Sequence, residues 1–177
     1  MIEEIKRLAE SLHPRITGFR RHLHANPELS FQEFKSQQFI EEQLDALGVT
    51  DHQRMAHTGV VALLKGRNPE SRVIALRADM DALPILEAND VEYRSKNDGV
   101  MHACGHDVHT ASLLGVAAIL KQLQDRFDGT VKFIFQPGEE KLPGGASLMI
   151  KEGVLSDPAP VSVIGQHVMP QIPAGKI

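Results

Sequence analysis

The chain has 177 residues, of which 42% are hydrophobic and 24% are charged, and its net charge is −4 at pH 7. This length suits one domain with a sizeable core and is short for two. The negative charge and the lack of a basic stripe argue against nucleic acid as a partner. No apolar run approaches the ~20 residues that span a bilayer. A single cysteine excludes an internal disulfide, so we expect a soluble protein of a reducing compartment, the cytoplasm.

Two helices are expected in the first quarter of the chain. Apolar side chains recur every three or four positions over residues 2–23, which is the pattern of an amphipathic helix. Pro14 lies inside this pattern and predicts a kink or a break into two helices. Residues 30–33 have the sequence of a capping box, in which Ser30 and Glu33 bond each other's backbone amides. The helix that they start should run to about residue 47, with Gly48 in a left-handed conformation behind it.

The following segments alternate between short strands and helices. Residues 59–64 and 72–76 are apolar runs separated by turn formers, which predicts a hairpin. The same criteria predict a helix at 109–126, a strand at 131–135, a short helix at 146–152 and a buried strand at 161–164. Helices followed by strands that alternate with helices predict an α/β domain with a mixed sheet.

Polar side chains follow three of these strands. Asp79 and Asp81 follow the run at 72–76, Glu139 and Glu140 follow the strand at 131–135, and His167 follows the strand at 161–164. In open α/β sheets ligands bind beyond the carboxyl ends of the strands, so these groups are expected to converge. Taken alone, each of them is more typical of a solvated turn, or of a core or loop histidine, than of a binding site.

Residues 101–110 hold the only cysteine, Cys104, together with three histidines and an aspartate. Thiolate, imidazole and carboxylate groups at such short spacing can bind a transition metal. A buried cysteine among polar loop histidines is the alternative for this segment taken by itself. A divalent metal lowers the pKa of its bound water to about 7, and Glu139 or Glu140 beside it could take that proton and pass it to a leaving amine.

Five strings occur in order along the chain: RHLHANPEL at 21–29, RADMDALP at 77–84, HACGHD at 102–107, QPGEE at 136–140 and GQHV at 165–168. Together they resemble the M20 metallopeptidase family, and within it the amidohydrolase branch of aminoacylases, hippurate hydrolases and auxin-conjugate hydrolases. The resemblance implies a three-layer αβα zinc-exopeptidase-like catalytic domain with a mixed sheet. It also implies hydrolysis of the amide bond of a small N-acyl amino acid or peptide-like substrate, with two divalent ions (Zn, Mn, Co or Ni).

The matching positions imply roles for six residues. The metal ligands would be Cys104, His106, Glu140 and His167. Glu139 would be the general base and acid, and Asp81 would orient a ligand in the catalytic centre. The remaining histidines of the strings are expected in supporting or structural roles: His22, His24, His102 and His109.

Members of this family are longer than this chain. Residues 1–177 are therefore expected to form the N-terminal part of the catalytic domain, without its lid domain, its C-terminal part and one late metal-binding histidine. An unpaired sheet edge and weak or absent activity would follow. One alternative is a non-catalytic metal-binding or self-associating remnant, with a homo-oligomer left open. Another makes Cys104 a nucleophile activated by a histidine, which leaves Glu139 and His167 unexplained.

Overall fold

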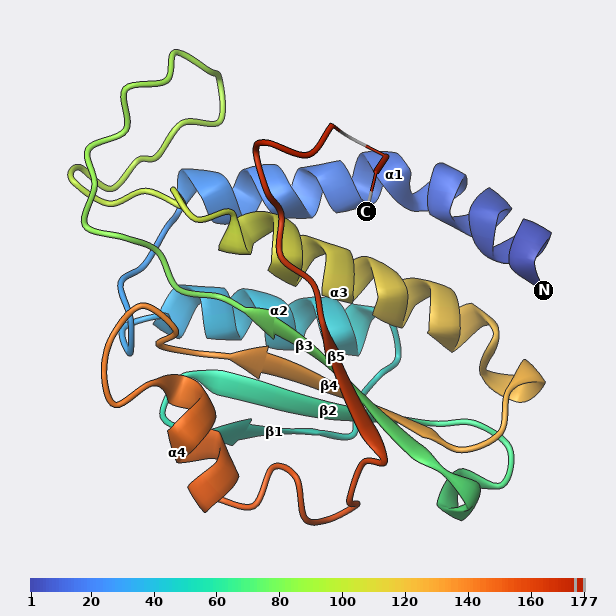
Figure 1. Cartoon of the computed structure of the whole chain (residues 1–177). Helices are drawn as coiled ribbons and strands as arrows, with labels where there is room; N and C mark the ends of the chain where they lie inside the picture. The colour runs from blue at the N-terminus through green and yellow to red at the C-terminus, as the bar shows by residue number, and fades with distance from the viewer. Residues whose placement is uncertain (174, 177) are drawn as a thin grey trace.

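The computed structural model describes residues 1–173, 175 and 176. Its helices and strands are, in chain order, α1 (Ile2–Ala25), α2 (Phe34–Ala46), β1 (His52–Met55), β2 (Gly59–Lys65), the 3-10 turn η1 (Pro69–Ser71), β3 (Val73–Asp79), α3 (His106–Gln122), the 3-10 turn η2 (Gln124–Arg126), β4 (Thr130–Gln136), α4 (Gly145–Lys151) and β5 (Ser162–Gly165). The strands form one sheet in the order β1-β2-β4-β3-β5 (Figure 1). β2 runs antiparallel to both β1 and β4, whereas β3 runs parallel to both β4 and β5. The predicted mixed sheet is confirmed.

Helices cover both faces of the sheet, which confirms the three-layer architecture (Figure 1). On one face α2 and α3 bury the larger core against β2 and β4, and α1 lies over α3. The centre of this core holds Leu44, Leu114 and Phe133, none of which is accessible to solvent. On the other face α4 covers a smaller core around Ala75, Ile134 and Met149.

The predicted hairpin between β2 and β3 is wrong. β4 lies between them, so that Val61 pairs with Ile134 on one side of β4 and Leu76 pairs with Phe133 on the other. The turn formers that follow β2 instead form η1 and pair with the segment before β4, where Gly66 donates to the Gly129 carbonyl. The parallel β3–β4 pair needs a crossover connection, and α3 provides it.

β5 is also different from its prediction, because all four of its residues are exposed. Side chains such as Val163 and Ile164 are half exposed, at 51% and 52%. Within the described part of the chain β5 pairs only with β3, so its other edge has no partner strand. Sequence patterns also gave no indication of β1, a short and mostly polar strand.

The N-terminal helix is continuous across Pro14, so of the two predicted alternatives, a kink or a break, the break into two helices is excluded. Apolar contacts hold the helix on both sides of the proline: Leu8 packs with Ile119 before it, and Phe19 belongs to the main core after it. The capping box is wrong as well, since Ser30 and Glu33 bond distant residues. The Glu28 carboxylate instead accepts from the Lys35 and Ser36 amides in the first turn of α2. Gly48 has the predicted left-handed conformation, with φ +76°.

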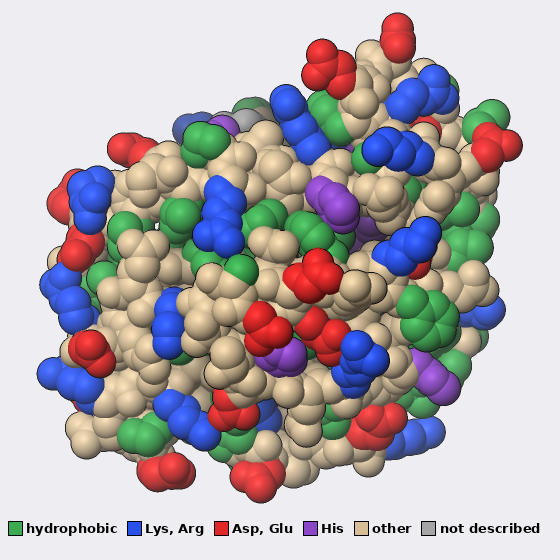
Figure 2. Space-filling view, turned by 180° about the vertical axis from the view of Figure 1, so that it is seen from behind, with side chains coloured by type: hydrophobic (Ala, Val, Ile, Leu, Met, Phe, Trp, Pro, Cys, Tyr) green, Lys and Arg blue, Asp and Glu red, His purple; other side chains and the backbone are tan. Residues whose placement is uncertain are grey.

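No helix among the described residues is long and apolar enough to cross a membrane. On the face opposite that of Figure 1, the lysine and arginine side chains of the described chain alternate with aspartate and glutamate, without a continuous basic patch (Figure 2). This mixture agrees with the small net charge of −4.

Candidate metal centre

His106 is the first residue of α3, three residues before the expected start of this helix, and it lies at the centre of the site. Its ring is 1% exposed, and its Nδ1 donates to the backbone carbonyl of Asp81 over 2.9 Å. Burial opposes the charged form of His106, but the hydrogen bond to Asp81 and the charges of Asp79 and Asp81 outweigh it and raise the pKa. With its proton on Nδ1, the neutral ring directs an unprotonated Nε2 towards the Glu140 carboxylate, 3.8 Å away.

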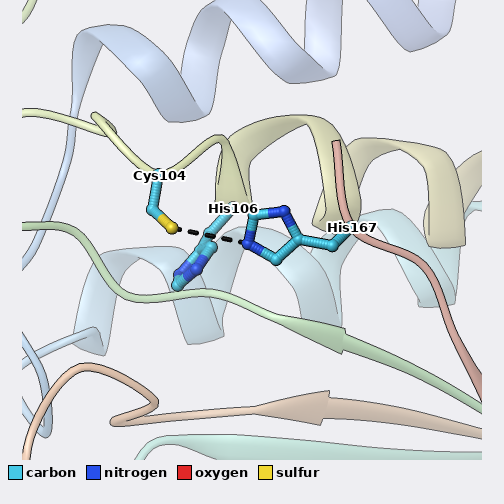
Figure 3. Close-up of side chains that lie close together, drawn as sticks. All are labelled: Cys104, His106 and His167. Atoms are coloured by element: carbon cyan, nitrogen blue, oxygen red, sulfur yellow. Dashed lines mark hydrogen bonds between the residues drawn. The ribbon is translucent and has the colours of Figure 1, made fainter. Parts of the chain in front are cut away.

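Cys104 and His167 face His106 from two other segments (Figure 3). Cys104 lies in the loop before α3, and its Sγ is 3.4 Å from Nε2 of His167, which follows β5. Burial and the neighbouring Glu140 carboxylate raise the pKa of the Cys104 thiol to about 11. The surrounding side chains therefore disfavour a free thiolate nucleophile, whereas a divalent cation beside the sulfur would favour the thiolate.

Asp81 connects this centre to the loop that carries Glu139 and Glu140. Its Oδ2 accepts from Ser30 Oγ over 2.5 Å and from the Glu140 amide over 3.0 Å, and its Oδ1 is 3.3 Å from His106 Nδ1. Burial alone would raise the pKa of Asp81, but the hydrogen bonds from His106, Ser30 and the Glu139 and Glu140 amides lower it to about 2. Asp81 thus holds the His106 imidazole through its backbone carbonyl and the glutamate loop through its carboxylate.

The glutamate loop begins at a turn that only glycine fits. Gly138 has φ +54°, and a Cβ there would lie 2.4 Å from the ring of Phe31. The Gly138 amide donates over 2.8 Å to Glu33, which is inaccessible to solvent and also accepts from the Thr58 hydroxyl. Burial raises the pKa of Glu33 and these hydrogen bonds oppose the rise. This buried anchor ties the loop to the start of α2.

Ligand atoms of three residue groups lie within 4.8 Å of one another, and His106 belongs to all three. The groups are Cys104 with His106 and His167, His106 with Glu139 and Glu140, and Asp79 with His106 and His109. The buried Nε2 of His106 has no hydrogen-bond partner among the described residues. This is expected of a nitrogen whose lone pair binds a metal ion. Sulfur, nitrogen and oxygen donors around one orphaned imidazole fit a divalent transition metal.

The structure thus brings together the six residues singled out in the sequence, at the carboxyl ends of β3, β4 and β5, where an open α/β sheet binds its ligands. Sequence reasoning missed the contributions of Ser30 and Glu33, because it used both as a helix cap. It also gave no specific task to Asp79 and His109, although both lie close to or inside the quoted strings. His24 is separate from the centre and bridges Asp107 and Glu87 in a buried network.

Comparison with known proteins identifies the family. The sequence profile of the peptidase family M20/M25/M40 matches residues 75–177, more than half of the chain. The chain belongs to this family. Four of the five strings, all but the one at 21–29, lie within the matched residues.

Relatives of this M20 chain include an N-acyl-L-amino acid amidohydrolase of Geobacillus stearothermophilus, 53% identical over 99% of the chain and 46% of the relative. An N-acetylcysteine deacetylase of Bacillus subtilis is 45% identical over 95% of the chain and 43% of the relative. The crystal structure of Bacillus subtilis YXEP, described as a dinuclear metal-binding peptidase of the M20 family, is 43% identical and superposes with a TM-score of 0.86 over 93% of the chain and 45% of YXEP. The chain therefore spans less than half the length of these relatives.

Proposed function

We propose that this M20 chain forms the metal-binding part of an amidohydrolase that cleaves the amide bond of N-acyl amino acids. The observation that carries the proposal is the convergence of Cys104, His106 and His167 with Glu139 and Glu140. We assign Cys104, His106, Glu140 and His167 as ligands of a pair of divalent ions. The relatives named as an amidohydrolase and as a deacetylase support this reaction class and a small acylated substrate.

Each group has a distinct task in this proposal. When bound, the divalent ions would polarise the scissile carbonyl and increase the acidity of the attacking water. Glu139 takes a proton from that water and delivers it to the leaving amine nitrogen, because it lies beside the ligand Glu140 and faces solvent. Asp81 keeps His106 in the tautomer that leaves Nε2 free and holds the Glu140 backbone in place. A free Cys104 thiol suits a reducing compartment such as the cytoplasm.

The decisive experiment combines metal analysis with an amino-acid release assay. The purified chain is loaded with Mn²⁺ or Zn²⁺ and incubated with N-acetyl and N-benzoyl amino acids. Glu139→Gln should lower turnover by ~100-fold or more, since it removes the proton carrier, and should leave the metal content unchanged. Glu3→Gln, on the exposed first turn of α1, is the matched control. Equal turnover in Glu139→Gln and in the unchanged chain would refute the assignment of Glu139.

The exposed edge of β5 favours a second candidate, a non-catalytic protein that binds metal or associates with itself. A groove of about 650 Å³ lies between β5 and α3, and its apolar lining includes Leu113, Val116 and Ile164. An exposed edge strand beside apolar surface is a template for pairing with another chain. This candidate predicts oligomers that bind metal without turnover at any metal concentration. A monomer by light scattering that hydrolyses substrate would exclude it.

A further inference from the structure

His167 stands on a segment that its own strand holds poorly. β5 has four residues, all of them exposed, and its pairing with β3 ends at Gly165. Among the described residues, the His167 ring bonds only the adjacent Val168 carbonyl, through Nδ1, and the Cys104 sulfur, through Nε2. Neither contact attaches the segment to the buried part of the domain. Some other group must therefore fix the position of this imidazole.

His109, one turn into α3, provides such an attachment. The backbone amide of Val168 donates to Nε2 of His109 over 2.9 Å. Because Nε2 accepts a hydrogen bond here, the ring proton lies on Nδ1, which donates to Oδ1 of Asp79 over 2.6 Å. Asp79 is 1% exposed at the end of β3, where Arg77 is 2.7 Å from its other oxygen. A directional chain thus runs from a central strand, through His109, to the residue after His167.

Two packing contacts hold the same segment. A Cβ at Gly105, whose φ is +87°, would lie 2.4 Å from Cγ2 of Val168, so the valine side chain rests on the backbone between Cys104 and His106. The rings of His109 and His167 meet edge to face, with centroids 4.6 Å apart. Val168 is therefore held through both its amide and its side chain, and the ring of the preceding residue, His167, packs on His109.

We propose that His109 is a positioning residue, which holds the His167 segment against the metal centre and is not itself a ligand. Asp79, His106 and His109 lie close enough together to suggest a further ion site. Both nitrogens of His109 are already engaged, however, whereas Nε2 of His106 has no partner among the described residues. This inference rests on the proposed metal centre, because the task of His109 would be to keep His167 within reach of the ion that Cys104 binds.

Two amide substitutions separate the two hydrogen bonds of His109. The terminal group of glutamine reaches the position of Nε2, so His109→Gln keeps an acceptor for the Val168 amide. Asparagine reaches only the position of Nδ1, so His109→Asn keeps a donor for Asp79 and loses that acceptor. The affinity for Co²⁺ is measured against a competing chelator, and the thiolate-to-cobalt absorption band reports whether Cys104 remains bound.

His109→Asn should weaken Co²⁺ binding by ~10–100-fold, as His167→Ala should too, and should add no further loss in the His167→Ala background. His109→Gln should bind nearly as tightly as the unchanged chain. Three results would overturn the inference: an Asn variant that binds normally, equal losses in both variants, or an additive loss on top of His167→Ala.

Two measurements without metal keep the inference separate from the proposed function. Long-range ¹H–¹⁵N spectra of the unchanged chain should show the His109 proton on Nδ1, and an Nε2–H tautomer would contradict the proposed chain. The Val168 amide should be protected from hydrogen exchange in the unchanged chain and in His109→Gln, and should lose this protection in His109→Asn. If the unchanged chain binds no Co²⁺, the proposed metal centre fails, while the tautomer and the exchange rates still decide the role of His109.

Discussion

Gly138→Ala tests the turn that presents the glutamate loop. The backbone there has φ +54°, a left-handed conformation that costs a residue with a side chain ~1–2 kcal/mol. The new methyl carbon would also lie 2.4 Å from the Phe31 ring, an overlap that overpacked sites relieve at a cost of ~1–3 kcal/mol. We therefore expect the free energy of unfolding to fall by roughly 2–5 kcal/mol, the sum of these two costs.

The two costs can be measured separately by urea unfolding. In a Phe31→Ala background the ring is absent, so Gly138→Ala should cost only the backbone part, about 1–2 kcal/mol. Gly99→Ala is the matched control, because Gly99 has φ +73° and no atom of the described residues lies within 4 Å of the place that its Cβ would take. It should show the backbone cost alone. If Gly138→Ala costs no more than Gly99→Ala, or equally much with and without the Phe31 ring, the steric explanation is refuted.

Two further changes test the electrostatics of the site and the helix over α3. Because the pKa of Asp81 is lowered to about 2 in the folded chain, its contribution to stability is complete above about pH 4 and is lost as the pH falls towards 2. In metal-free protein this contribution amounts to roughly 2–3 kcal/mol. The free energy of unfolding in urea should therefore change less between pH 5 and pH 2 in Asp81→Asn than in the unchanged chain. The same pH dependence in both proteins would contradict this role of Asp81. Pro14→Ala should raise the free energy of unfolding by ~1–3 kcal/mol, since proline lacks the amide of a helix interior and Pro14 is exposed. An unchanged or lower midpoint of urea unfolding would contradict this prediction.

Local signals in the sequence predicted the elements that depend on local chemistry. The apolar run of β4 and the glycine after α2 were sufficient for their assignments, because strand propensity and a left-handed C-terminal residue are properties of a few neighbouring positions. The order of the strands was not predictable in this way. The insertion of β4 between β2 and β3 depends on pairings between segments far apart in the chain, and a turn-rich loop fits both a hairpin and a longer connection.

The candidate site shows the same division. Asp81, Glu139, Glu140 and His167 could be singled out because they follow strands, and Cys104 and His106 because of their short spacing. All six also match the family strings. The supporting residues could not be assigned, because Ser30 and Glu33 are satisfied by partners 51 and 25 residues away. A capping pattern and a long-range anchor use the same residue types, and only the tertiary structure distinguishes them.

β5 gives the proposed metal centre a second consequence. Cys104 and His167 are 63 residues apart in the chain, and His167 follows a strand whose residues are all exposed. An ion that both residues bind would close this long loop and act as a cross-link, much as a disulfide limits the unfolded chain. Chelators would then do more than remove a reactive centre. They would loosen the outermost strand, so that metal supply would govern how readily this protein aggregates or is degraded by proteases.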